Sequence, residues 1–570
     1  MLNLSIVVPT LNRRDILTKT LPRLLNQDVP NGIYEVVVVS DGSTDGTVDF
    51  VRSLRSPVPL RVLDRPHLGA SSARNAGIEA AHGELVLLLD DDMLCESTLV
   101  GRHLARHQDG SPSIVIGSVL TSSESYPGFA CEFTKQAHRL YHDAIARGET
   151  GAVQWLSNNF SAPRKLLLSH GGYDERFTYS EDHEFAIRLW NAGVSFKFLY
   201  DEPVYEIYTK GTEHVVNSDS PRLGSSDVQL SRKHPGYRRE SVPASILGET
   251  RVKLMMWWLC CVIPVSPGKT LRIPCSLAER LRSNPQIEKF GIRLLHYRKA
   301  IAIMRGAMGE VGSWKGLRRE FGIRLPVLRY TRLGSVKKFE AHVRWLARRG
   351  YKGIAAADWV AWVEKGMPLP ERPILFMFEG ADSKLADHAL PVLRRYGFRA
   401  LVFVDIAQPG SKPEDDGELR QAGRRRWAPS QLQYWANEGI EFGIQNRTSP
   451  RRIQIVGDKL ADQIKRGTEE LAQRLGRRPI AFAYQAGSIS GDLLDQVRRS
   501  FEIAFGDASG LNALSTDLHL MRTTEIKPSD RIFKLASAVH FGRSALKLRR
   551  PKFVTAGASI GLPEAQSYKA

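Results

Sequence analysis

Three consecutive carboxylates, Asp90, Asp91 and Asp92, follow the apolar run Leu85–Leu89. Five apolar residues in a row indicate a strand that is buried on both faces, as strands of parallel sheets usually are. Because side chains alternate along an extended chain, Asp90 and Asp92 are predicted to point the same way and Asp91 the other way. Two carboxylates at the carboxyl end of such a strand suit a divalent cation that also binds phosphate oxygens. Taken alone, the stretch is explained equally well by an acidic turn or a helix cap.

This acidic strand end closes a longer alternation of strands and helices. Apolar strands are predicted at 4–8, 36–39 and 60–63, and each is followed by a helical segment. The alternation predicts an α/β fold with a mostly parallel sheet and a ligand at the carboxyl ends of its strands. Polar pairs follow the strands at that edge, and a chance acidic turn does not explain three of them in order: Thr10 and Asn12, Asp41 and Ser43, Asp90 and Asp92. Neither a GxGxxG nor a GxxxxGK[ST] motif is present, which disfavours dinucleotide and P-loop chemistry.

The pieces VVPTLNR, VVVSDGSTDGT, ASSARNAGI and LLLDDDM resemble, in this order and spacing, the motifs of family-2 glycosyltransferases of the GT-A fold. The resemblance covers about residues 3–215 and implies a nucleotide-diphosphate sugar donor, most often a UDP-sugar. The substrate-binding residues that it implies are Pro9, Thr10, Leu11, Asn12, Arg13, Asp41, Ser43, Arg74, Asn75 and Asp90. It also implies that Asp90 and Asp92 bind a Mn²⁺ or Mg²⁺ ion on the diphosphate. Leu11 stands where the family often has an aromatic residue, which predicts weaker stacking on the base.

A candidate catalytic base lies in the run GGYDERFTYSEDHEFAIRL, where Glu181 and Asp182 begin a predicted helix. An isolated acidic pair at this place often only complements the helix dipole. The run resembles the acceptor-side motif of the same family, which implies that Asp182 is the base, with Glu181 as its neighbour or substitute. Many members have a histidine near the metal soon afterwards. The stretch Tyr205–Tyr208 has none here, and His214 is the nearest candidate.

The composition restricts the classes of function. The chain has 570 residues, 42% hydrophobic and 25% charged, so it can bury the cores of several domains. Residues 1–220 carry 20 Lys and Arg against 28 Asp and Glu, whereas the remainder carries 60 against 33. This uneven charge disfavours a nucleic-acid binder and suits an anionic glycan, an anionic membrane face or merely a solvated surface. The five cysteines form no CxxC pair and no signal peptide is evident, so we expect a cytoplasmic protein.

Residues 221–320 are predicted to form a basic helical connector. Within it, residues 254–263 are uninterruptedly apolar, and basic residues flank them in the segment 251–269. The run is far shorter than the ~20 residues of a membrane-spanning helix. Two interpretations stay open: a core helix packed on the transferase domain, or an interfacial helix in peripheral contact with anionic lipid on the inner face of the membrane.

A second alternation of strands and helices predicts another α/β domain, a barrel or partial barrel, over 321–545, followed by a tail at 546–570. Its framework, including PVLRRYGFRALVFV and AFAYQAG, resembles the polysaccharide deacetylases of carbohydrate esterase family 4, or NodB-homology domain. The family's catalytic and metal-binding Asp and His positions hold Glu379, Gly380, Gln445 and Ser449 here, and two further family positions hold Thr331 and Gln485. Gly, Gln and Ser do not hold a divalent metal, so we predict an inactive deacetylase-like domain that binds glycan, orients an acceptor or serves as a scaffold.

Together these features predict a metal-dependent, inverting glycosyltransferase with its catalytic domain at residues 1–220. It would transfer a sugar to a glycan or a lipid-linked acceptor, with Asp182 as base. Two alternatives stay open. One is a bifunctional glycosyltransferase and polysaccharide deacetylase. The other is a non-enzymatic carbohydrate-binding scaffold.

Overall fold

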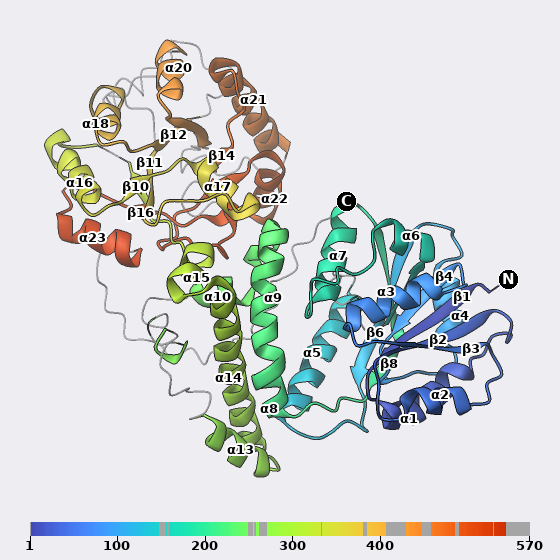
Figure 1. Cartoon of the computed structure of the whole chain (residues 1–570). Helices are drawn as coiled ribbons and strands as arrows, with labels where there is room; N and C mark the ends of the chain where they lie inside the picture. The colour runs from blue at the N-terminus through green and yellow to red at the C-terminus, as the bar shows by residue number, and fades with distance from the viewer. Residues whose placement is uncertain are drawn as a thin grey trace. The chain divides into compact units, whose positions relative to one another are not determined.

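The computed structural model describes residues 2–542 except for 148–155, 157–158, 249–254, 256–257, 262–270, 332, 380–384, 406–428, 446–457, 485–488 and 528. Its contacts form two compact units (Figure 1). Unit 1 contains Met1–Leu230 and Met255–Trp314, and unit 2 contains Ser231–Leu254 and Lys315–Gly557. The expected connector over 221–320 is therefore divided between the two units. Most of the apolar run 254–263 and its flanks lies outside the described residues.

Unit 1 begins with the predicted alternation of strands and helices. Its strands are β1 (Leu4–Thr10), β2 (Tyr34–Asp41), β3 (Leu60–Arg65), β4 (Leu85–Leu89), β5 (Met93–Leu94), β6 (Ser113–Thr121), β7 (Asn159–Pro163) and β8 (Ser195–Glu206). Its helices are α1 (Arg14–Leu25), α2 (Thr47–Ser53), α3 (Ala70–Ala80), α4 (Leu99–Arg106), α5 (Phe129–Ala146), α6 (Arg164–Ser169), α7 (Glu181–Asn191), α8 (Thr212–His214), η2 (Val215–Asp219), α13 (Arg272–Arg280) and α14 (Pro285–Val311). Helix α9 (Ser220–Lys233) runs from unit 1 into unit 2.

The strands of unit 1 form one sheet in the order β3-β2-β1-β4-β7-β6-β8-β5. Strands β1 to β4 pair in parallel, β7 is antiparallel to both β4 and β6, and β6 is parallel to β8. Two reversals restore the original direction, so β1, β2, β4, β6 and β8 all end at the same edge of the sheet. The predicted mostly parallel α/β sheet is confirmed, and this edge collects the polar residues that follow each strand.

Each face of this sheet has its own layer of helices. Alternate strand residues such as Val7, Val37 and Leu88 pack against α3, α5, α6 and α7. Their neighbours Ile6 and Val38 face the opposite side and pack against α1, α2 and α4. Burial on both faces explains why these strands are apolar at every position rather than at every second one.

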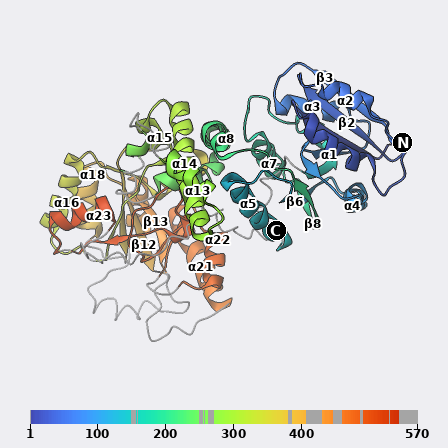
Figure 2. The same ribbon diagram turned by 90° about the horizontal axis from the view of Figure 1, so that it is seen from below.

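Unit 2 contains a second α/β sheet, in the order β15-β14-β13-β12-β11-β9-β16, in which all neighbours are parallel. The strands are β9 (Val327–Tyr330), β10 (Lys352–Gly353), β11 (Pro373–Glu379), β12 (Ala400–Asp405), β13 (Glu441–Gln445), β14 (Ala481–Ala483), β15 (Ile503–Phe505) and β16 (Thr524–Glu525). The helices are η3 (Pro235–Arg239), α10 (Val242–Leu247), α15 (Trp314–Phe321), α16 (Val336–Arg348), α17 (Ala356–Lys365), η4 (Leu385–Ala389), α18 (Leu390–Arg395), α20 (Pro429–Asn437), α21 (Asp458–Leu475), α22 (Gly491–Ser500), η7 (Leu518–Leu520) and α23 (Ile532–Phe541). Figure 2 shows α16, α18, α21 and α23 around the strands β12 and β13. The predicted second α/β domain is confirmed.

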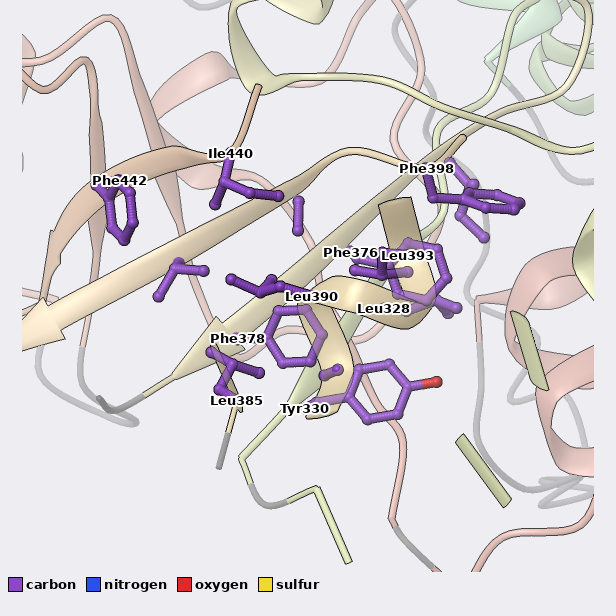
Figure 3. Close-up of a cluster of buried hydrophobic side chains, with 14 of the residues drawn as sticks. Leu328, Tyr330, Phe376, Phe378, Leu385, Leu390, Leu393, Phe398, Ile440 and Phe442 are labelled. Atoms are coloured by element: carbon purple, nitrogen blue, oxygen red, sulfur yellow. The ribbon is translucent and has the colours of Figure 1, made fainter. Parts of the chain in front are cut away.

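The largest core of unit 2 lies between this sheet and its helices. Tyr330, Phe376 and Phe378 from β9 and β11 meet Leu390 and Leu393 of α18 there, and all five are buried (Figure 3). The rings of Tyr330 and Phe378 are stacked with centroids 5.5 Å apart. A core of this size indicates that unit 2 is a well-packed domain.

Gly77 allows α3 to approach β1 and β2 closely. A Cβ atom at this position would lie 2.2 Å from Cγ1 of Val7 and 3.1 Å from Cγ2 of Val39. We therefore expect Gly77→Ala to destabilise unit 1 by about 1–3 kcal/mol through overpacking. Hydrogen exchange of the α3 and β1 amides in the full chain measures this as a loss of protection.

Gly101 provides the matched control, because it lies in helix α4 and a Cβ there would meet nothing closer than 3.6 Å. We expect Gly101→Ala to stabilise its helix by about 0.5–1 kcal/mol. Equal gains in protection for the two variants would contradict the close approach at Gly77.

Candidate active site

The three aspartates diverge at the carboxyl end of β4. Asp90 lies on the α3 side, where one of its oxygens is 3.0 Å from Arg74. Asp91 faces α1, accepts a hydrogen bond from Thr10 Oγ1 at 2.7 Å and lies 3.5 Å from Arg13 Nε. Asp92 binds the same Arg13 through Nη2 at 2.6 Å. Asp92 therefore shares its cation with Asp91 and not with Asp90. The predicted alternation fails here because β4 ends at Leu89 and the chain then turns.

Burial and mutual repulsion weaken the acidity of this cluster. Burial raises the pKa of Asp91 to about 6, although Arg13 opposes the shift. Burial, together with repulsion from Glu206 and the neighbouring aspartates, raises the pKa of Asp92 well above its usual value. The 2.6 Å ion pair with Arg13 does not outweigh these effects. Such a cluster of hard oxygen donors suits Mn²⁺ or Mg²⁺ chemically. In the described part of the chain, however, no three His, Cys, Asp or Glu side chains are arranged around one metal position.

Glu206 is a further acidic residue beside these aspartates, and it was not among the predicted site residues. It ends β8 and pairs with Met93 of β5, while the amide of Ile207 donates to the Asp92 carbonyl at 2.8 Å. Burial and the charge of Asp90 raise the pKa of Glu206 to about 7. The same strand-end pattern that marked Asp90 could have identified Glu206. His214, considered from the sequence as a ligand, lies instead 3.4 Å from Asp219.

Arg74 joins the two predicted halves of the site. Its Nη2 lies 3.0 Å from Asp90 and its Nη1 lies 2.7 Å from Glu181, the first residue of α7. The guanidinium is fully enclosed and lies over the ring of Tyr173, 5.4 Å from its centroid. Burial disfavours its charge, yet Asp90 and Glu181 together raise the pKa of Arg74 well above its usual value. The strand-end motif and the acceptor-side motif are thus held together by one buried cation.

Asp182 lies beside this cation without being bound to it. It is half-buried in the first turn of α7, after Ser180, whose backbone adopts a left-handed conformation with φ 56°. Among the described residues, no hydrogen bond or ion pair occupies the Asp182 carboxylate. Burial raises the pKa of its neighbour Glu181, which is held by Arg74. Of the two carboxylates, Asp182 is the one that Arg74 does not hold in place.

The residues expected to bind the nucleotide lie at the ends of β1 and β2. The Asn12 amide donates to Ser43 Oγ at 3.0 Å, and Asn12 Oδ1 accepts from the Thr44 amide at 2.7 Å. These bonds join the loops after β1 and β2 into one rim. Pro9 lies in β1 just before this rim, and Leu11 lies on the rim and is 39% exposed. Asp41 is buried and accepts from the Leu68 amide at 2.8 Å, so its carboxylate orders the loop before α3.

The Asn75 side chain makes its hydrogen bonds to the backbone of a neighbouring loop. Its side chain donates to the Tyr173 carbonyl at 2.9 Å and accepts from the Tyr173 amide at 2.8 Å. Asn75 therefore fixes the GGYDERF loop against α3, next to the Arg74 bridge. We find Thr10, Arg13, Arg74, Asp90, Asp92, Glu181 and Asp182 at one edge of the sheet.

The deacetylase-like positions of unit 2 lack the same chemistry. Glu379 ends β11, and one of its oxygens lies 3.2 Å from Arg329 Nη1 of β9. Gln445 ends β13, is buried, and has a side-chain oxygen without a partner among the described residues. Thr331 directly follows β9, whereas Gly380, Ser449 and Gln485 lie outside the described residues. An amide and a carboxylate that is neutralised by Arg329 are a poor set of metal ligands.

The raised pKa values predict how stability depends on pH. Below about pH 4.5 the Glu206 carboxyl is protonated in both the folded and the unfolded chain. Between about pH 4.5 and 7 only the folded chain keeps this proton, so the free energy of unfolding falls as the pH rises. We expect Glu206→Gln to raise the free energy of unfolding by about 2–3 kcal/mol at about pH 7.5 and to leave it unchanged near pH 4. Urea unfolding in the presence of a chelator measures this.

The exposed Glu79 on α3 provides the control. Glu79→Gln should change the unfolding free energy little at either pH. A loss of stability in Glu206→Gln at neutral pH would show that this carboxylate is not repelled by the aspartates.

Two parts of the chain match families of known proteins. Residues 5–137 match the family model described as glycosyl transferase family 2, and residues 366–502 match the model described as polysaccharide deacetylase. Validoxylamine A glucosyltransferase of Streptomyces hygroscopicus subsp. jinggangensis (strain 5008) is 32% identical over 265 residues, which cover 42% of this chain and 62% of that relative. The match thus spans less than two thirds of the relative's own length.

Two solved structures match the chain at low identity. The structure of residues 1–349 of Staphylococcus aureus TarS in complex with UDP shares 19% identity over 54% of this chain and 90% of that chain, with a TM-score of 0.32. Streptococcus pyogenes deacetylase PplD in complex with acetate shares 16% identity over 38% of this chain and 98% of its own, with a TM-score of 0.34. The two family matches confirm both resemblances. The chain joins a family-2 glycosyltransferase domain, which includes residues 5–137, to a polysaccharide-deacetylase-like domain, which includes residues 366–502.

Proposed function

We propose that unit 1 is an inverting glycosyltransferase that moves a sugar from a nucleotide-diphosphate sugar to a glycan or a lipid-linked acceptor. The observation that carries this proposal is the Arg74 bridge between Asp90 and Glu181. It places the strand-end aspartates next to the carboxylate pair that begins α7. The similarity to validoxylamine A glucosyltransferase supports transfer of a hexose, and a UDP-sugar is the donor that we favour.

In this mechanism, the half-buried Asp182 removes the proton from the acceptor hydroxyl as that oxygen attacks the anomeric carbon. The bond between this carbon and the diphosphate oxygen breaks, and the attack from the opposite side inverts the configuration. Negative charge then develops on the departing diphosphate. Arg13 and Arg74 are the cations that this chain places beside the aspartates at that edge.

Asp90 and Asp92 are the residues that we propose for holding Mn²⁺ or Mg²⁺. A divalent ion there would neutralise charge on the diphosphate oxygens. Asp92 is now bound to Arg13, so metal binding requires that Arg13 share or release this carboxylate. Asp91 accepts a hydrogen bond from Thr10 and points to the α1 side, away from Asp90, which favours a structural role for Asp91. Glu206 adds a further oxygen donor at the same edge.

A cavity of about 570 Å³ in unit 1 is our candidate for the acceptor site. Its walls come from the segments that follow β6 and β8, and from α13, so it lies at the edge of the sheet that carries the aspartates. The lining includes the polar residues Lys210, Thr212, Glu213, His214, Ser276, Glu279, Arg280 and Arg282. Such a polar lining suits the hydroxyl groups of a sugar.

Substitution of the proposed base tests this mechanism. We expect Asp182→Asn to lower transfer by about 10²–10⁴-fold, because the hydroxyl loses its general base. Nucleotide release in a screen of UDP-, GDP- and TDP-sugars with Mn²⁺ measures the rate. KM for the donor should change much less, since Asp182 serves the acceptor.

Glu84 directly precedes β4, at the opposite edge of the sheet from the aspartates, and its exposed side chain provides the control. Glu84→Gln should retain the rate of the unaltered chain. Unchanged turnover in Asp182→Asn would exclude Asp182 as the base. If Glu181→Gln then abolished turnover, Glu181 would be the base instead.

We propose that unit 2 has no deacetylase activity and that its remaining role is to bind glycan or support the assembly. The bifunctional alternative requires an activated water, and Glu379 with Gln445 offers too few ligands for the metal that would supply it.

An assay for acetate distinguishes the two possibilities. The full chain, incubated with N-acetylated oligosaccharides and Zn²⁺, Co²⁺ or Mn²⁺, should release no acetate above the level without protein. Metal-dependent release of acetate that persists in Asp182→Asn would establish the bifunctional enzyme instead.

A further inference from the structure

Helix α13 presents an apolar stripe to solvent. Ile273, Leu277 and Leu281 are spaced four residues apart and are 74%, 56% and 49% exposed. The opposite side of the helix is buried, where Cys275 and Ala278 pack against Leu294 and Leu295 of α14. Since α13 is already anchored by that side, the core of unit 1 does not require the exposed stripe. Exposed apolar rows of this kind mark interaction surfaces.

Helix α14 also carries exposed apolar and basic side chains. Phe290 and Tyr297, spaced two helical turns apart, are 55% and 58% exposed, and Lys289 and Arg293 lie on the same side of the helix. The buried side of α14 at this level carries Ile292, Leu294 and Leu295. We call the exposed residues Ile273, Leu277, Arg280, Leu281, Lys289, Phe290, Arg293 and Tyr297 the α13–α14 face.

The charge of this surface has one sign. Between residues 271 and 297, the exposed charged residues are Arg272, Arg280, Lys289 and Arg293, all cationic. The two acidic residues of this stretch, Glu279 and Glu288, are only half-exposed. Glu279 is already engaged, since it accepts from the Phe129 amide and from Thr212 Oγ1, both at 3.0 Å. Arg272 is 3.5 Å from Glu213, whereas Arg280, Lys289 and Arg293 have no acidic partner among the described residues.

We propose that the α13–α14 face docks unit 1 on the surface of an anionic lipid membrane. Apolar side chains between unpaired cations match the boundary between acyl chains and anionic headgroups, and Tyr and Phe are suited to that depth. The proposed contact is a peripheral one. The described helices include none that is long and apolar enough to cross a membrane. This docking site differs from residues 251–269, for which a membrane contact was one of the two interpretations left open by the sequence.

Helix α13 links the proposed docking surface to the proposed acceptor cavity. Ser276, Glu279 and Arg280 of α13 also line the cavity that we propose for the acceptor. A membrane bound at the stripe would therefore lie beside the cavity, within reach of an acceptor whose sugar is attached to a lipid. The docking itself is independent of the proposed transfer reaction, because it rests only on exposed side chains and their charge.

Sedimentation with vesicles tests the proposal on the full chain. The unaltered chain should bind vesicles that contain phosphatidylglycerol, should bind pure phosphatidylcholine vesicles weakly, and should be released by salt. Leu277→Asp combined with Lys289→Glu should lower binding more than about tenfold, because the pair removes an apolar anchor and reverses a charge. Circular dichroism and nucleotide release with a soluble acceptor should stay unchanged in this variant.

Helix α6 of the same unit offers the matched control, since Lys165 and Leu168 are exposed there. Leu168→Asp combined with Lys165→Glu makes the same change of charge and should retain vesicle binding. Equal binding by both double variants would overturn the proposal. So would a dimer, detected by light scattering without vesicles, that the substitutions on α13 and α14 dissociate, since the surface would then bind a second copy of the chain.

Discussion

The buried guanidinium of Arg74 is the contact on which the site in unit 1 depends. Two carboxylates, Asp90 and Glu181, come from segments far apart in the chain and are brought to one cation. The guanidinium is buried at this depth, so its charge is not readily held without the two carboxylates. Loss of one member would leave an uncompensated charge in an enclosed place. The bridge therefore fixes α3, β4 and α7 relative to one another and determines the geometry of the site.

The carboxylates around Asp92, unlike those at Arg74, are not fully balanced by a cation. Glu206, Asp90 and Asp91 repel Asp92, and Arg13 compensates these charges only in part. Strain of this kind is typical of functional sites, where an incoming cation relieves it. Unit 2 shows the contrast: Glu379 is neutralised by Arg329, and nothing similar to the repelling cluster is present among its described residues. The two units thus share an architecture and differ in the charge that their strand ends leave uncompensated.

Much of this site could be predicted from strand ends, because parallel strands place their carboxyl ends at one edge. The pairs at Thr10, Asp41 and Asp90 lie there as expected. The orientation of Asp92 could not be predicted, because it depends on a turn after Leu89 and on Arg13. The Arg74–Glu181 contact joins residues 107 positions apart and follows from the packing of α3 against the α7 region. Glu206 was missed because a histidine was expected near it, although its place at the end of β8 would have identified it.

The central claim is that the edge of the unit 1 sheet binds a nucleotide diphosphate together with a divalent cation. Calorimetric titration of the full chain with UDP, GDP and TDP, with Mn²⁺ and with chelator, tests it most directly. The account predicts binding of at least one of these nucleotides that requires Mn²⁺ and that Asp92→Asn weakens. It would be contradicted if none of the three nucleotides bound with the metal present, or if binding were the same with chelator and in Asp92→Asn.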